Sequence, residues 1–82
     1  MIRVVGEQEN YLVVTNGTHC TVVERRAGRY YPLGKCSVPS VELDEQGFGQ
    51  LVRMGGTYTE ITAMRRMNEV ATQWRDLFEL LR

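Results

Sequence analysis

The sequence predicts an α+β domain in which a small antiparallel β-meander of about three to five strands packs against one long C-terminal amphipathic helix. Two observations predict this class. Residues 2–54 form short segments, rich in β-branched side chains and separated by glycines, which is typical of strands joined by tight turns. Residues 57–82 contain no glycine or proline and repeat their apolar side chains with helical spacing. Because 82 residues suffice for one core, we expect residues 1–82 to form a single domain.

The first predicted feature is a β-hairpin near the N-terminus. Residues 2–5 form a short first strand, and a polar turn leads into a second strand at Tyr11–Thr15. Asn16-Gly17 then predicts a two-residue turn, because both residues tolerate a positive φ angle, and the return strand covers residues 18–24. A turn of this length fixes the cross-strand pairs. They are Tyr11 with Val22, Leu12 with Thr21, Val13 with Cys20, and Val14 with His19.

This register divides the hairpin into two faces, since neighbouring side chains of a strand point in opposite directions. The more apolar face is expected to lie under the C-terminal helix; it carries Tyr11, Val13, Cys20 and Val22. The other face carries Leu12, Val14, His19, Thr21 and Val23. This second face is too apolar for a sheet that is open to water. We therefore expect either that the middle of the chain covers it or that it forms a second binding surface.

The next segment predicts a third hairpin strand at an edge of the sheet. Residues 25–28 end in a glycine that suits a turn, and the strand follows at residues 29–33. Pro32 has no N–H to donate to a ladder, which places this strand at an edge or ends it. Residues 34–40 are expected to form a loop.

The middle of the chain fits two structures. Ser40 precedes Val-Glu-Leu-Asp-Glu, which is typical of a helix N-cap followed by a first turn. Gly47 and Gly49 would each destabilise such a helix by about 1 kcal/mol. The other structure is a hairpin with strands at residues 41–43 and 48–53. The glycines favour the hairpin, and the helix remains the alternative.

The C-terminal segment predicts a helix with one apolar face. Thr57 and Glu60 fit a capping box, in which the threonine hydroxyl accepts a hydrogen bond from a backbone N–H of the first turn. About 24 helical residues make a rod of roughly 36 Å, whereas a compact domain of this size has a radius of gyration of about 12 Å. The far end of the helix is therefore expected to project from the body. The apolar face consists of Met64, Met67, Val70, Ala71, Trp74, Leu77, Phe78 and Leu81.

Composition narrows the classes of function. Ten acidic and ten basic residues give a formal net charge of zero, which disfavours binding to bulk nucleic acid or to an acidic membrane. The sequence shows no signal-peptide pattern and no apolar run long enough to span a bilayer, so we expect a cytoplasmic protein. His19, Cys20 and Cys36 are too few and too poorly placed to form a metal site. With no catalytic or nucleotide motif, we expect no cofactor and no enzymatic activity.

We expect a non-catalytic protein-binding module, acting as a small regulator, inhibitor or adaptor of a protein partner. The helix end also predicts a homodimer, because alternating spacings of four and three residues form a seam along which two helices pack. The seam consists of Met67, Ala71, Trp74, Phe78 and Leu81. Two alternatives remain open. Either the middle segment folds back over this end within one chain, or the end binds a different protein.

A nucleic-acid-binding or transcription-regulating domain is the alternative function. Basic side chains beside aromatic rings are typical of surfaces that bind single-stranded nucleic acid. Residues 25–35 bring such side chains together, although a solvated turn explains them more simply. The candidate patch consists of Arg25, Arg26, Arg29, Tyr30, Tyr31 and Lys35.

Overall fold

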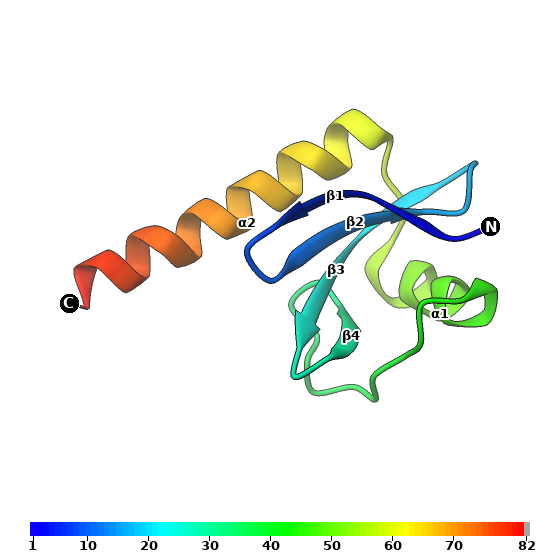
Figure 1. Ribbon diagram of the computed structural model, residues 1–82, viewed down its shortest axis with the longest axis horizontal. Helices are drawn as coiled ribbons and strands as arrows, with labels where there is room; N and C mark the ends of the chain where they lie inside the picture. Colours follow the sequence, from blue (N-terminus) through cyan, green and yellow to red (C-terminus); the bar gives the residue numbers. More distant parts are fainter. Residues whose placement is uncertain (82) are drawn as a thin grey trace.

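The structure of the protein is a computed structural model that describes residues 1–81 (Figure 1). Within this range a four-stranded sheet precedes two helices, so the predicted α+β class is confirmed. Neighbouring strands run antiparallel in the order β1-β2-β3-β4, which is the predicted meander. The elements are β1 (Arg3–Gln8), β2 (Tyr11–Thr15), β3 (Cys20–Arg26), β4 (Arg29–Pro32), α1 (Glu45–Gly55) and α2 (Glu60–Leu80).

The sheet carries one helix on each face. α2 lies along β1, β2 and β3, whereas α1 lies against β3 and β4 (Figure 1). The buried cluster between α2 and the sheet contains Tyr11, Val13, Cys20, Val22, Ala63, Met67 and Ala71. The buried cluster between α1 and the sheet contains Leu12, Val14, Val23, Phe48 and Leu51. The domain therefore has three layers, where the sequence predicts a sheet and one long helix.

The hairpin of β2 and β3 has the predicted faces but not the predicted register. Val13 pairs with Val22 instead of Cys20, and Thr15 pairs with Cys20, so the predicted two-residue turn is wrong. The offset is two residues, and an even offset leaves each strand side chain on its own face because side chains alternate. The predicted division of apolar residues between the two faces is therefore confirmed by the two buried clusters.

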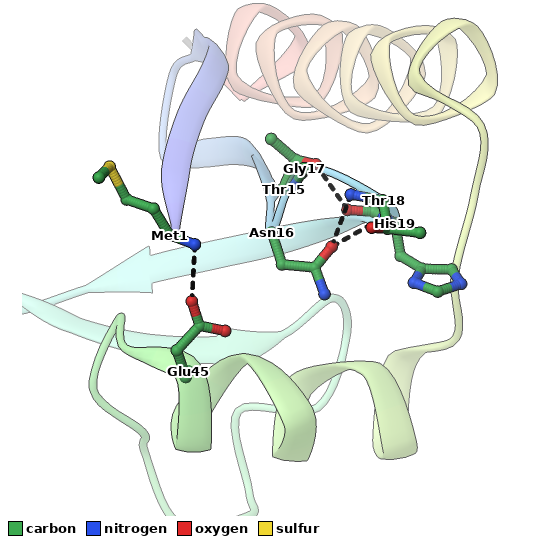
Figure 2. Close-up of polar contacts among 7 residues, drawn as sticks. All are labelled: Met1, Thr15, Asn16, Gly17, Thr18, His19 and Glu45. Atoms are coloured by element: carbon green, nitrogen blue, oxygen red, sulfur yellow. Dashed lines mark hydrogen bonds and ion pairs between the residues drawn. The ribbon is translucent and has the colours of Figure 1, made fainter.

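Side-chain hydrogen bonds explain the longer turn (Figure 2). Asn16 Oδ1 accepts the backbone N–H of Thr18 at 2.9 Å and that of His19 at 2.8 Å. Thr15 Oγ1 accepts the N–H of Gly17 at 3.0 Å and donates to the carbonyl of His19 at 2.7 Å. These bonds satisfy backbone groups that a tight turn would pair across the ladder. His19, predicted on a strand, therefore lies in this exposed loop.

The outer strands differ from the prediction mainly at their ends. β1 continues to Gln8, beyond the predicted end at residue 5. β4 is an edge strand, as Pro32 predicts. Proline has no backbone N–H, and at an edge no neighbouring strand needs one. Val41 forms an isolated bridge with Tyr30, and no longer strand forms at residues 41–43.

The middle segment is a helix, so the predicted hairpin at residues 41–53 is wrong. Its N-cap is Asp44 rather than Ser40, and the Asp44 carboxylate accepts the backbone N–H of Gly47 at 2.7 Å. A Cβ atom at Gly47 would lie only 1.7 Å from the carbonyl oxygen of Glu42. This glycine is present because the preceding backbone approaches it closely, not because the helix breaks there.

α1 covers the second face of the sheet. Phe48 and Leu51 are buried against Leu12, Val14 and Val23. Burial of two large apolar side chains is worth about 1.5–3 kcal/mol each, which exceeds the helix-propensity penalty of the glycines. The interpretation of this face as a second binding surface is therefore wrong, and the alternative in which the middle segment covers it is confirmed.

α2 begins later than the capping-box pattern predicts. Its N-cap is Thr59, whose side chain accepts a backbone N–H of the first turn, and its first helical residue is Glu60. Thr57 lies outside the helix, so the predicted capping box is wrong. The reason is a contact with the sheet: the N–H of Tyr58 donates to the carbonyl of Cys20 at 2.9 Å. This bond holds the chain before α2 in an extended conformation.

Candidate functional site

The apolar face of α2 continues beyond the sheet that covers its first half. Met67 and Ala71 are buried against the sheet, whereas the exposed fraction is 47% for Trp74 and 69% for Phe78. Figure 1 shows the orange and red part of α2 extending past the turn that joins β1 to β2. We call residues 74–81 the projecting tip. Its large exposed apolar side chains are Trp74, Leu77, Phe78, Leu80 and Leu81.

The fold divides the seam predicted for a helix dimer. Met67 and Ala71 belong to the buried cluster under α2, so a partner cannot reach them, and their assignment to an interface is wrong. Gly6 permits this close packing, because a Cβ atom there would lie 2.5 Å from the Sδ of Met64. The accessible part of the predicted seam consists of Trp74, Phe78 and Leu81.

The middle segment does not cover the projecting tip. α1 packs on the opposite face of the sheet, against β3 and β4, and makes no contact with α2. The predicted alternative in which residues 41–54 fold back over this end is therefore wrong. Two occupants remain, namely a second copy of the chain and a different protein.

Two grooves flank Trp74 at the base of the projecting tip. The larger, with a volume of about 880 Å³, lies between the tip and the turns that join β1 to β2 and β3 to β4. We call it the sheet-end groove; Trp74 and Phe78 form one wall, and Asn10 and Ala27 line the side formed by the turns. The smaller, of about 630 Å³, lies on the side of Trp74 that faces Leu77 and the C-terminal end of α1. The exposed apolar face thus borders concave surface on both sides.

Both grooves share a lining of polar side chains from the two central strands, near the end of the sheet. Tyr11 and Glu24 pair directly across β2 and β3, and both are buried. The Glu24 carboxylate accepts a hydrogen bond from Arg26 Nε at 2.5 Å, which compensates its charge. Neither Tyr11 nor Glu24 is predicted as a site residue from the sequence. Only the strand register and the position of the tip bring these side chains beside Trp74.

Burial changes the acid–base properties of this polar lining. Removal from water raises the pKa of the Tyr11 phenol, and the neighbouring Glu24 carboxylate raises it further. Cys36 does not line either groove but lies close to the same Glu24 carboxylate, and burial, followed by this carboxylate, raises the pKa of its thiol. Both groups are therefore protonated at neutral pH. Because a protonated thiol is a weak nucleophile, Cys36 is not an activated cysteine.

An ion pair fastens the base of the tip to the sheet. Arg75 Nη2 lies 3.3 Å from Glu9 Oε1, in the turn that joins β1 to β2. Both side chains are about half exposed, so the pair contributes no more than about 1 kcal/mol. Its main consequence is that Arg75, at the rim of the sheet-end groove, already has a charge partner within its own chain.

The predicted nucleic-acid patch has most of its cations engaged. Arg25 pairs with Glu7 at 3.0 Å, and Arg26 pairs with the buried carboxylate described above. Lys35 Nζ donates to a backbone carbonyl near the end of α1 at 2.7 Å. Arg29 lies exposed at the start of β4. Each engaged cation has less charge to offer to a phosphate.

The aromatic side chains of the same patch lie on opposite faces of β4. Tyr30 pairs with Arg25 and packs against the cluster under α1, so its ring contributes to the core. Tyr31 pairs with Glu24 on the other face. Stacking of successive bases needs rings on one continuous surface. The structure therefore does not bring the six predicted residues together.

Neither a metal site nor a membrane-spanning helix in the described part of the chain, nor a similarity to known proteins, indicates a role for this surface. Among residues 1–81 no group of three His, Cys, Asp or Glu side chains is arranged to hold a metal ion. Neither α1 nor α2, the helices of the described range, has the length and apolar character needed to cross a bilayer. Comparisons with protein-family models, with curated proteins and with solved structures found no match.

Proposed function

We propose that this protein is a non-catalytic protein-binding module, acting as a small regulator, inhibitor or adaptor, and that the projecting tip of α2 is its binding surface. The single observation behind the proposal is the exposure of Trp74, Phe78 and Leu81, which continue the core-facing stripe of α2 beyond the sheet. Aromatic side chains are enriched at the centres of protein interfaces. A contiguous apolar surface on a small domain is typical of an interaction site.

The exposed apolar area of the projecting tip supports a moderate affinity for a protein partner. At about 200 Å² per large side chain, the exposed fractions of Trp74, Leu77, Phe78 and Leu81 correspond to roughly 500 Å². Burial of that area yields about 12 kcal/mol of gross hydrophobic free energy. Association costs about 4–15 kcal/mol. The tip alone is therefore marginal, and a partner gains affinity by also filling the sheet-end groove.

The chemistry of the groups around Glu24 supports a non-catalytic role. The raised pKa values of Tyr11 and Cys36 keep both groups neutral, so neither supplies an anionic base or nucleophile near pH 7. Arg26 is occupied by the Glu24 carboxylate. Such groups are suited to hydrogen bonding at the rim of an interface rather than to proton transfer.

Quantitative affinity capture from the native cell tests the proposal. The three baits are the wild-type chain, a Phe78→Asp, Leu81→Asp double variant, and Ile61→Asp as a matched control. Ile61 is also an exposed apolar residue of α2, at 73% exposure, but it lies at the other end of the helix. We expect one or more proteins to be captured by the wild-type and control baits and reduced at least tenfold with the double variant.

A purified candidate must then reproduce this order of affinities in a titration calorimeter. If the double variant captured and bound the same proteins as strongly as the wild-type chain, the projecting tip would not be the binding surface. Circular dichroism of all three baits checks that the comparison is made between folded chains.

A further inference from the structure

We propose that the occupant of the projecting tip is a second copy of this chain, in an antiparallel arrangement about a two-fold axis. In this arrangement the tip of each copy lies in the sheet-end groove of the other. The inference rests on the proposed function, because it assumes that the tip is a protein-binding surface. Closed two-fold dimers are the commonest assembly of soluble proteins.

The direction of the apolar stripe limits how an occupant can approach. At 100° per residue, Trp74, Leu77, Phe78 and Leu81 fall within an arc of roughly 100°, and this arc continues the line of Met67 and Ala71. The exposed stripe therefore faces the same side of α2 as the sheet. A binding partner must therefore approach the side of the projecting tip that faces the sheet, beside the turns at the end of the sheet. The available space, about 880 Å³, suits one slender element such as a helix end.

The length of the tip matches the groove that a second copy offers. The rise from Trp74 to Leu81 is about 10 Å. When two tips run antiparallel, Leu81 of one copy reaches the level of Trp74 of the other, at the inner end of the groove. The crossing point then falls between Leu77 and Phe78, which are the central side chains of the exposed stripe. Spacings of three and four residues along the stripe let both tips interlock over this length.

The exposed apolar area of two projecting tips is sufficient for an interface between two copies. The area of one tip is insufficient for specific binding to a flat surface. Two tips together remove roughly 1,000 Å² of apolar surface from water, and the polar rims of two grooves add to this. Specific interfaces bury about 1,200–2,000 Å² in total. The dimer therefore reaches the lower end of the specific range only because both tips and both grooves take part.

The charges permit this arrangement. The formal net charge is zero, so two copies do not repel at long range. Arg75, beside the stripe, is paired with Glu9 of its own chain and does not introduce an unpaired cation. Asp76 points away from the stripe, since it lies about 100° around the helix from Leu77 and about 140–160° from the other three apolar residues.

Sedimentation equilibrium between about 1 and 100 µM tests whether the occupant is a second copy. We expect the wild-type chain and the Ile61→Asp control to form dimers with the same dissociation constant. Phe78→Asp should weaken the dimer at least tenfold, and Leu81→Asp provides a second variant near the end of the chain if Phe78→Asp does not fold. A monomer mass for the wild-type chain at the highest concentration would overturn the inference, as would a dimer that both variants leave unchanged.

A distance measurement tests the antiparallel arrangement. A spin label on Arg65→Cys, in a Cys36→Ser background, lies on the exposed side of the covered half of α2, while Cys20 is buried. For antiparallel tips we expect roughly 35–45 Å between the two labels. Parallel tips would place the two labels at the same level along the two helices and therefore at a clearly shorter distance, which would overturn the arrangement.

Different results would contradict the proposed binding surface and the proposed dimer. A monomeric chain whose captured partner is lost with the Phe78→Asp, Leu81→Asp variant would overturn the second copy as occupant and retain the tip as a binding surface. A dimer that keeps its dissociation constant in that variant would overturn both the inference and the role of the tip in self-association.

Discussion

The two halves of α2 have the same apolar periodicity and different surroundings. In the first half Met67 is 6% exposed and lies on the sheet, whereas in the second half Phe78 is 69% exposed. A periodic pattern reports which side of a helix is apolar and carries no information about what covers that side. The comparison therefore teaches that the end of the sheet, and not a change in the sequence of the helix, creates the candidate site.

The lengths of the elements account for the difference. β2 has 5 residues and α2 has 21. At about 3.3 Å per strand residue and 1.5 Å per helix residue, they span roughly 17 Å and 32 Å. The sheet consequently ends about halfway along α2, and the apolar stripe continues into open space.

The largest expected effect comes from placing an aspartate in the covered half of α2 and comparing it with an aspartate in the uncovered half. Ala71→Asp buries an unpaired carboxylate under α2, and we expect it to lower the free energy of unfolding by at least about 3 kcal/mol or to prevent folding. Phe78→Asp adds the same charge to the exposed tip and should change it by less than about 0.5 kcal/mol. Urea unfolding at a concentration where the chain is monomeric measures both values. Equal losses would contradict the division of α2 into covered and uncovered halves.

Two of the glycines in α1, Gly47 and Gly49, allow a similar comparison within a second helix. Gly47→Ala places a Cβ atom against the carbonyl of Glu42, and we expect a loss of about 2 kcal/mol or more in the free energy of unfolding. Gly49 is exposed with open space around it, so Gly49→Ala should stabilise the protein by about 0.5–1 kcal/mol through helix propensity. Thermal unfolding monitored by circular dichroism measures the opposite shifts. A stabilising Gly47→Ala would show that Glu42 does not approach the helix closely.

A smaller effect is expected at a position where backbone conformation alone matters. Gly17 has a φ angle of +97° and nothing near the position of a Cβ atom. Gly17→Val should therefore cost about 1–2 kcal/mol through backbone strain, without a steric clash. Thr18→Val, in the same exposed loop, is the matched control and should stay within about 0.5 kcal/mol of the wild-type chain. An unchanged urea midpoint for Gly17→Val would rule out the positive φ angle.

The smallest expected effect concerns Tyr11, in the lining of the grooves, and the nearby Cys36 at alkaline pH. The folded chain raises the pKa of Tyr11 and of Cys36, so the unfolded chain releases these protons at lower pH than the folded chain does. The stabilisation is therefore complete below the ordinary pKa values and is lost as the pH rises above about 8.5–10. Tyr11→Phe with Cys36→Ser should flatten this decline in a series of urea midpoints. A decline of the same slope in the double variant would place the cause elsewhere.

The sequence by itself determined the class of the fold and the directions of most side chains. β-branched runs and helical spacing predict the meander and α2, and Pro32 predicts the edge strand. Alternation along β2 and β3 assigns the faces correctly although the register is off, because an even offset does not exchange the faces. Trp74, Phe78 and Leu81 of the candidate site were predicted for the same reason, since they depend only on the periodicity of one helix.

The tertiary structure decided the features that depend on contacts between segments. The bond from Tyr58 to Cys20 delays the start of α2, and burial of Phe48 on the second face makes a helix of a glycine-rich segment. Trp74 meets Tyr11 only after β2 is paired and α2 has been laid across the sheet. Local patterns record the preferences of neighbouring residues, whereas grooves and covered faces arise from the relative lengths and positions of packed elements.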